Sequence, residues 1–173
     1  MAWPPHSTLR HNSLVIEPLL PPDLLDLTLR LIAATLIGGL VGLDREVRRK
    51  PAGLRTHALV SLGAALVIVV VIRTTPVGYQ HVDAVSRVIQ GIIAGVGFLG
   101  GGAILKSNDN EIVHGLTTAA SIWLVAALGI ACGAGQWVTA LVACLIAIVV
   151  LVAGSPVEAL VHRITRRDSS KPR

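Results

Sequence analysis

Residues Arg87–Lys106 read RVIQGIIAGVGFLGGGAILK, an apolar run with a basic residue at each end. A run of about 20 apolar residues is long enough to cross the hydrocarbon core of a bilayer as a helix. Its glycines recur four apart, at Gly91 and Gly95 and again at Gly97 and Gly101. This spacing of small residues lets helix backbones approach closely in lipid, where no hydrophobic force joins them. We therefore expect a transmembrane helix against which other helices pack.

The rest of the chain contains four more runs of this kind. Of its 173 residues, 53% are hydrophobic and only 14% are charged, so little is left for a soluble domain. The sequence predicts an all-α, polytopic transmembrane bundle with five spans, at about residues 24–43, 56–72, 85–105, 115–132 and 137–153. It also predicts a proline-rich external tail at 1–23, a five-helix domain at 24–153 and a basic cytoplasmic tail at 154–173.

The basic residues are sorted by loop. With five spans, the loops after the first and third spans share one side with the C-terminal tail, and these segments carry eleven of the fifteen Lys and Arg residues. By the positive-inside rule, the N-terminus lies outside and the C-terminus is cytoplasmic. Because topology explains the net charge of +5 and aromatic residues are few, nucleic acid is not an expected partner.

The densest charge follows the first span, in DREVRRKPAGLRTH at residues 44–57. One interpretation is a topogenic loop that binds anionic lipid head groups. The other is a functional site on the cytoplasmic face for a carboxylate, a phosphate or a lipid head group, because a base, a hydroxyl and an imidazole together open the second span. The candidate residues are Arg45, Glu46, Lys50, Arg55, Thr56 and His57.

Polar side chains within the spans form a second candidate group. Gln90 needs a partner in lipid, either a neighbouring helix or a substrate. Thr117 and Thr118 either bond to their own helix or reach the third span. The sequence predicts helix packing or a pore at Gln90, Gly91, Gly95, Gly97, Gly100, Gly101, Thr117 and Thr118, and it predicts no catalytic, cofactor or metal residue.

Three blocks together resemble the MgtC/SapB family of bacterial inner-membrane proteins. They are GLDRE with KPAGLRTH at residues 42–57, GVGFLG at 95–100 and GLTTAASIW at 115–123, in order and with fitting separations. The resemblance covers about residues 31–153. Two departures stand out: Gly101 occupies a position where the family usually has alanine, and longer members continue into a soluble C-terminal domain, so this chain resembles a short form.

The resemblance implies a multi-pass protein of the inner membrane that is linked to growth in low magnesium and, in some pathogens, to survival inside macrophages. Members of the family look like regulators of other membrane systems, and the proton-driven ATP synthase and phosphate uptake are the proposed targets. The family motifs map here onto Arg45, Glu46, Lys50, Pro51, Arg55, Thr56, His57, the third-span glycines, Thr117, Thr118 and Trp123.

Two functions compete. The leading hypothesis is a non-enzymatic regulator that contacts another membrane protein, or a second copy of itself, through helices within a bilayer that contains anionic lipids. The alternative is a transporter or channel for magnesium or another small ion, which would use the carbonyl groups of a helix broken at Gly100–Gly102. An enzyme is the weakest class, because the nearest pairing of a nucleophile and a base is His57 with Ser61 on one helix face.

Overall fold

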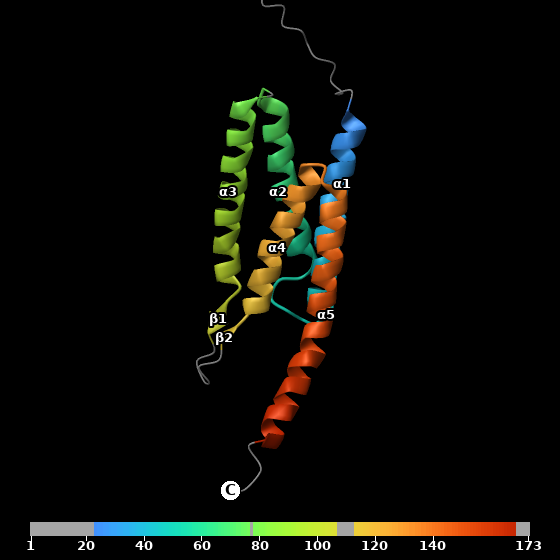
Figure 1. The fold of residues 1–173 in the computed structure, drawn as a ribbon, viewed down its shortest axis with the longest axis vertical. Coiled ribbons are helices and arrows are strands. Elements are labelled where there is room, and N and C mark those ends of the chain that lie inside the picture. Colours follow the sequence, from blue (N-terminus) through green and yellow to red (C-terminus); the bar gives the residue numbers. More distant parts are fainter. Residues whose placement is uncertain (1–22, 77, 107–112, 169–173) are drawn as a thin grey trace, which may run out of the picture.

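The computed structural model describes residues 23–76, 78–106 and 113–168, and within them the chain is almost entirely helical. Five helices form one bundle (Figure 1). Their bounds are Leu24–Val47 for α1, Leu54–Thr74 for α2, Tyr79–Gly102 for α3, Leu116–Gly133 for α4 and Trp137–Asp168 for α5. All five are long and apolar enough to cross a membrane. The predicted all-α class and the five spans are thereby confirmed.

The ends of the helices follow local chemistry. The α1–α2 loop contains Lys50 and Pro51, and proline restricts the residue before it to non-helical conformations. A two-residue antiparallel pair, β1 (Leu105–Lys106) and β2 (Val113–His114), closes the connection from α3 to α4. Gly115 then starts α4 with a φ of 93°, and a Cβ there would lie 2.0 Å from the Ala103 carbonyl oxygen. Only glycine fits this turn without strain.

Three helices run clearly beyond the spans that the sequence predicts, and one of them, α3, begins at Tyr79 instead of near residue 85. α1 continues through the first charged residues to Val47 instead of ending near Leu43. α5 is one helix to Asp168 and extends past the other helices at the lower end of Figure 1. The N-terminal tail predicted at 1–23 falls almost wholly outside the described residues, as do residues 107–112 of the α3–α4 connection.

α2 is the central helix, and glycines on its neighbours bring the backbones together. On α1, a Cβ at Gly38 would lie 2.6 Å from the His57 carbonyl oxygen. On α4, a Cβ at Gly129 would lie 2.2 Å from the Ser61 carbonyl oxygen. α1 and α4 therefore both press against α2 at a distance that only glycine permits, and they also contact each other. This is the small-residue packing typical of membrane helices.

α3 lies at the edge of the bundle, beside α2 and α4 (Figure 1). Val96 and Ile92 pack against α4. A Cβ added at Gly100 would lie 3.6 Å from the Ala119 Cβ, which is an ordinary van der Waals distance. A Cβ at Gly91, Gly95, Gly97 or Gly101, however, would meet nothing within 4 Å outside its own helix. Other helices of the chain do pack against α3, as the sequence predicts, but they meet Ile92, Val96 and Gly100 and leave these four glycines uncovered. The close contacts of this chain use the glycines of α1 and α4.

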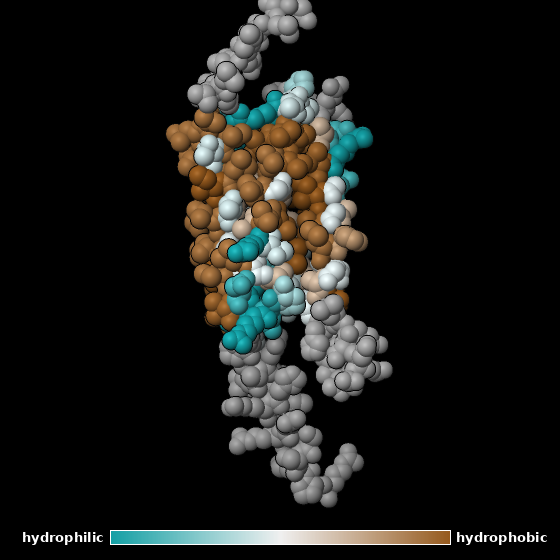
Figure 2. Space-filling model, turned by 180° about the vertical axis from the view of Figure 1, so that it is seen from behind, coloured by the Kyte–Doolittle hydropathy of each residue, from teal (hydrophilic) through white to brown (hydrophobic). Residues whose placement is uncertain are grey.

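The outer surface suits a bilayer. Figure 2 shows a hydrophobic band across the middle of the bundle, with hydrophilic residues gathered toward its two ends. Large apolar side chains such as Leu36, Leu66 and Val149 are exposed on it. Exposed apolar surface of this extent is favourable when lipid covers it.

Candidate functional site

Five polar side chains are buried among α1, α2 and α4. We call the end of the bundle where α1 ends and α2 and α4 begin the basic end, because Arg45, Arg48, Arg49, Lys50 and Arg55 lie there. The buried side chains form the polar cluster, which consists of Arg45 on α1, His57 and Ser61 on α2, and Thr118 and Ser121 on α4. Each of the five is at most 3% exposed, so each depends on protein partners.

Arg45 joins α1 to α4 within this cluster. Its Nη2 donates to the Thr118 hydroxyl at 2.9 Å, whereas its Nε, which is also buried, has no hydrogen-bond partner among the described residues. The neighbouring Asp44 pairs with Arg48, Nε to Oδ1, at 2.8 Å. A buried cation whose direct contact is a neutral hydroxyl is costly to hold in a membrane bundle. Among the five side chains of the polar cluster, that of Arg45 is therefore the most costly to bury.

His57 joins α2 to α4. Its Nδ1 lies 2.8 Å from the Gly53 carbonyl oxygen and its Nε2 lies 2.9 Å from the Ser121 hydroxyl oxygen. Because a carbonyl only accepts, Nδ1 carries a proton and donates it. The Ser121 hydroxyl has one proton, which it gives either to Nε2 or to the Thr118 carbonyl oxygen 2.8 Å away. The first arrangement suits a neutral imidazole and the second an imidazolium, so the hydrogen bonds accommodate both charge states.

Glu46 connects the end of α1 to the start of α2. Its Oε2 accepts a hydrogen bond from the Leu54 backbone N–H at 3.1 Å, and a Cβ on Gly53 would collide with this carboxylate. A carboxylate at the first turn of a helix satisfies a free N–H and interacts favourably with the helix dipole. Glu46 therefore caps α2. Lys50, four residues after Glu46, is exposed.

The structure divides the residues that the sequence nominated. Arg45 and His57, predicted for the basic loop, meet Thr118, predicted for the fourth span, in one buried cluster. Lys50, Arg55, Thr56 and Thr117 are exposed. Thr118 bonds to α1, and Thr117 faces a groove beside α5.

Ser121 belongs to the polar cluster, although it is not among the candidate site residues that the sequence nominates. It stands three positions after Thr118, which puts both on one face of α4, and that spacing was the available signal. Its connection to His57, 64 positions away, comes only from the packing of α4 on α2.

The predicted pore residues of α3 lie elsewhere. Gln90 is exposed, and its amide donates to Ser86 of the same helix at 3.3 Å instead of reaching another helix. α3 is continuous to Gly102, where the carbonyl oxygens of Gly100 and Gly101 accept hydrogen bonds from Ala103 and Ile104. α3 is therefore unbroken up to Gly102, and an ion path through Gly100–Gly102 stays a prediction.

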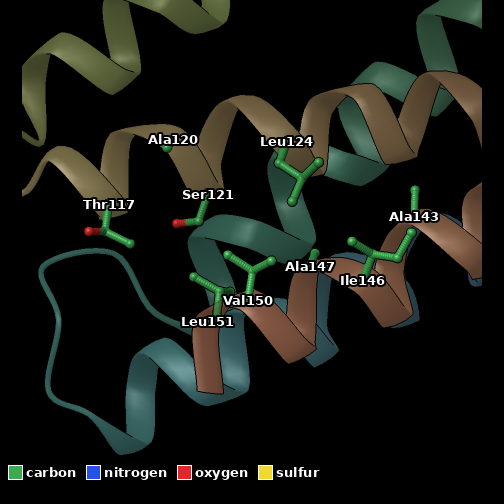
Figure 3. A pocket seen from close by; sticks show the side chains of 9 residues that line it. All are labelled: Thr117, Ala120, Ser121, Leu124, Ala143, Ile146, Ala147, Val150 and Leu151. Atoms are coloured by element: carbon green, nitrogen blue, oxygen red, sulfur yellow. The ribbon is translucent and has the colours of Figure 1, made fainter. Parts of the chain in front are cut away.

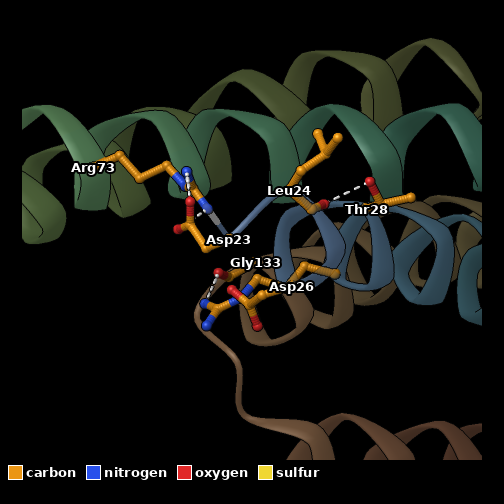
Figure 4. Close-up of polar contacts among 7 residues, drawn as sticks. Asp23, Leu24, Asp26, Thr28, Arg73 and Gly133 are labelled. Carbon is orange, nitrogen blue, oxygen red and sulfur yellow. Dashed lines mark hydrogen bonds and ion pairs between the residues drawn. The ribbon is translucent and has the colours of Figure 1, made fainter. Parts of the chain in front are cut away.

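At the opposite end of the bundle, two arginines connect neighbouring helices (Figure 4). Arg30 donates to Asp26 at 2.8 Å, as the sequence predicts, and also to the Gly133 carbonyl oxygen at 2.8 Å. It thereby satisfies the last turn of α4, where a cation is favoured by the helix dipole. Arg73 at the end of α2 pairs with Asp23 before α1. These contacts connect three helices and have a structural role.

Two apolar grooves lie on opposite sides of the bundle. The α4–α5 groove has a volume of about 390 Å³, and Thr117 and Ser121 line it along with apolar side chains of both helices (Figure 3). The α2–α3 groove has a volume of about 440 Å³ and is lined in part by Gly63, Gly91 and Gly95. Within the described part of the chain, no group of three or more His, Cys, Asp and Glu side chains is placed to hold a metal ion.

Comparison with known proteins adds a family. The model of the MgtC family matches residues 31–160. The chain is 45% identical to Protein SrpB of Synechococcus elongatus over 122 residues, which are 66% of this chain and 67% of that protein. It is 44% identical to Protein MgtC of Salmonella typhimurium over 118 residues, which are 68% of this chain and 48% of that protein. The chain therefore spans about half the length of the Salmonella relative, and no solved structure matches it.

Proposed function

Since the chain belongs to the MgtC family, we propose that it is a non-enzymatic, multi-pass protein of the bacterial inner membrane that regulates another membrane system through helix contacts. The observation that carries this proposal is the unused surface of α3. Four glycines on α3 have open space around them, whereas the glycines at the close contacts of α1 and α4 with α2, such as Gly38 and Gly129, have none. A surface with this composition suits the helix of another membrane protein.

The position of α3 supports the same function. Phe98 is 84% exposed and lies one position beyond Gly97 in a helix that packs on the bundle through its other side. Gln90 and Arg87 on the same helix are also exposed, so a partner can satisfy polar groups that lipid cannot. The α3 surface, defined as Gln90, Gly91, Gly95, Gly97, Phe98 and Gly101, is thus open to a partner helix along about three turns.

The biological setting of the proposal rests on the family resemblance. The resemblance supports a role in adaptation to low magnesium, with the proton-driven ATP synthase as one candidate partner and a second copy of the chain as another. By the positive-inside rule, the basic end of the bundle and the C-terminus lie on the cytoplasmic side. The transporter alternative has less support, because two of the carbonyl oxygens that it would use, those of Gly100 and Gly101, already accept backbone hydrogen bonds.

Site-specific photo-crosslinking in living cells tests the proposal. A benzophenone amino acid replaces Phe98 on the α3 surface or, as the matched control, Val138 on α5, which is 76% exposed. In magnesium-starved cells we expect the Phe98 probe to capture one membrane protein, and we expect Gly97→Ile to reduce that product at least tenfold. The control probe should capture lipid only.

The outcomes are distinguishable by mass. A product of twice the mass of the chain identifies a homo-oligomer as the partner, and a product with a subunit of the ATP synthase identifies that enzyme. Equal capture at both positions, or capture that Gly97→Ile leaves unchanged, contradicts recognition through the α3 surface.

A further inference from the structure

The first turn of α4 is an uncapped positive helix end. Gly115 is the N-cap residue and supplies no side chain, and the amides of Leu116, Thr117 and Thr118 precede the first residue that bonds back to Gly115. Free N–H groups and the helix dipole together favour an anion at such a position. A helix start alone does not make a site, but here a second feature points to the same turn.

That feature is the buried guanidinium of Arg45. It donates to the hydroxyl of Thr118 in this first turn, it is 3% exposed, and its Nε has no partner among the described residues. Of the nearby carboxylates, Glu46 caps α2, whereas Asp44 pairs with Arg48 through Oδ1 and offsets only part of the Arg45 charge, without a direct ion pair to it. A buried cation therefore faces the positive end of a helix, and none of the ion pairs within the described ranges involves it. This arrangement calls for a bound anion.

The α4–α5 groove begins at the same turn. Thr117 and Ser121 supply its polar lining, and Leu124, Ala143, Ile146 and Val150 are among its apolar side chains (Figure 3). From Thr117 to Leu124 the groove follows α4 for roughly 10 Å, at 1.5 Å per residue. An elongated apolar groove beside an anion-binding helix end has the two parts that an anionic lipid requires.

We propose that the groove between α4 and α5 binds an anionic phospholipid. Its phosphate accepts hydrogen bonds from the first-turn amides of α4 and from the Thr117 hydroxyl, while one acyl chain occupies the groove. Arg45 acts from the inner side by adding positive charge and by holding Thr118 in place. The α1–α2 loop, which carries the exposed Arg49 and Lys50, passes beside Thr117 and adds further positive charge. This site lies away from the α3 surface and does not depend on its role.

Electron paramagnetic resonance with spin-labelled lipids tests the proposal. The full chain is reconstituted in phosphatidylcholine vesicles that contain a trace of phosphatidylglycerol or phosphatidylcholine labelled on the acyl chain. We expect the chain to immobilise phosphatidylglycerol about fivefold more strongly than phosphatidylcholine, as one additional basic charge near the membrane surface provides.

Two variants separate the head-group and acyl-chain parts of the site. Ala120→Phe fills the groove from its exposed wall and should abolish the preference, whereas Ala153→Phe, on an exposed face of α5 outside the groove, should leave it unchanged. Thr117→Val keeps the shape of the groove and removes one phosphate donor, so the preference should fall to twofold or less. Circular dichroism and gel filtration establish that each variant is folded.

Three results would overturn the proposal. Equal immobilisation of both lipids by the unmodified chain would mean that the groove holds acyl chains without recognising an anion. A preference that survives both Ala120→Phe and Thr117→Val would move the lipid to another surface. Displacement of labelled phosphatidylglycerol by millimolar inorganic phosphate would assign the helix end to a free anion instead of a lipid.

Discussion

Glycines serve two different purposes in this bundle. Those of α1 and α4 lie against α2 so closely that an added Cβ at Gly38 or Gly129 would fall within 2.6 Å of a backbone carbonyl oxygen. Those of α3, at Gly91, Gly95 and Gly97, face open space at the edge of the bundle. The residue type and the four-residue spacing are the same in both regions, so spacing alone does not reveal which surface a chain uses for its own fold.

The difference has an energetic consequence. Glycine inside a helix costs stability relative to alanine, and α1 and α4 recover that cost through close backbone contact with α2. α3 carries the same cost without a compensating contact within the chain. The glycines of the α3 surface thus lower the stability of the isolated chain, whereas the proposed function uses them to bind a partner. Three substitutions test the contrast between the two regions.

The largest effect is expected at the α2–α4 crossing. A Cβ at Gly129 would lie 2.2 Å from the Ser61 carbonyl oxygen, which belongs to a helix backbone and cannot move aside cheaply. We expect Gly129→Ala to destabilise the protein by about 3 kcal/mol, the upper part of the range for overpacking. Thermal unfolding of the purified protein in detergent measures the loss. A change below 0.5 kcal/mol would show that the two helices can separate, which would weaken the contrast with α3.

A smaller effect is expected where α1 joins α4. Thr118→Val retains the shape of the side chain but leaves the buried Arg45 without the hydroxyl that accepts its hydrogen bond. Hydrogen bonds to charged groups contribute roughly 1.5–3 kcal/mol, so we expect a loss of about 2 kcal/mol in the same unfolding measurement. The neighbouring exposed Thr117 provides the control, and Thr117→Val should change stability by less than about 0.5 kcal/mol. Similar losses of unfolding free energy in the two variants would mean that the polar cluster does not stabilise the contact between α1 and α4.

The smallest effect is expected on α3, and its sign is reversed. Because nothing lies within 4 Å of a Cβ added at Gly95, Gly95→Ala should keep the fold and raise helix stability by about 0.5 kcal/mol. Unfolding of the isolated protein tests the gain. A loss of 1 kcal/mol or more would indicate that the protein was unfolding from a state in which this face is already covered, such as a homo-oligomer.

The helices themselves could be predicted from local sequence. Five apolar runs of membrane length predict the class and the number of spans, and an acid four residues before a base forms an ion pair within one helix at Asp26–Arg30 and at Asp44–Arg48. These features depend on neighbours within about a turn of helix, where sequence separation and spatial distance agree. The ends of α1 and α5 were predicted less well, because charged residues at a membrane surface can continue a helix that hydropathy alone would stop.

The site could be predicted only in part. Arg45, His57 and Thr118 stand out by residue type, since a cation, an imidazole and a hydroxyl are unusual at the ends of apolar runs. Their meeting, and the inclusion of Ser121, depend on the rotation of three helices about their own axes. Helix rotation follows from side-chain packing between segments far apart in sequence, which periodicity in nearly uniform apolar helices does not encode.

The sequence by itself determined that the chain crosses a membrane five times as helices, because a bilayer requires every backbone polar group to be bonded within its own segment. It also determined the chemistry of the basic end. Only the tertiary structure decided which small residues are used within the fold. A helix with regularly spaced glycines can pack closely on more than one neighbour. In this fold the helices that approach α2 most closely are α1 and α4, and the glycines of α3 are left uncovered.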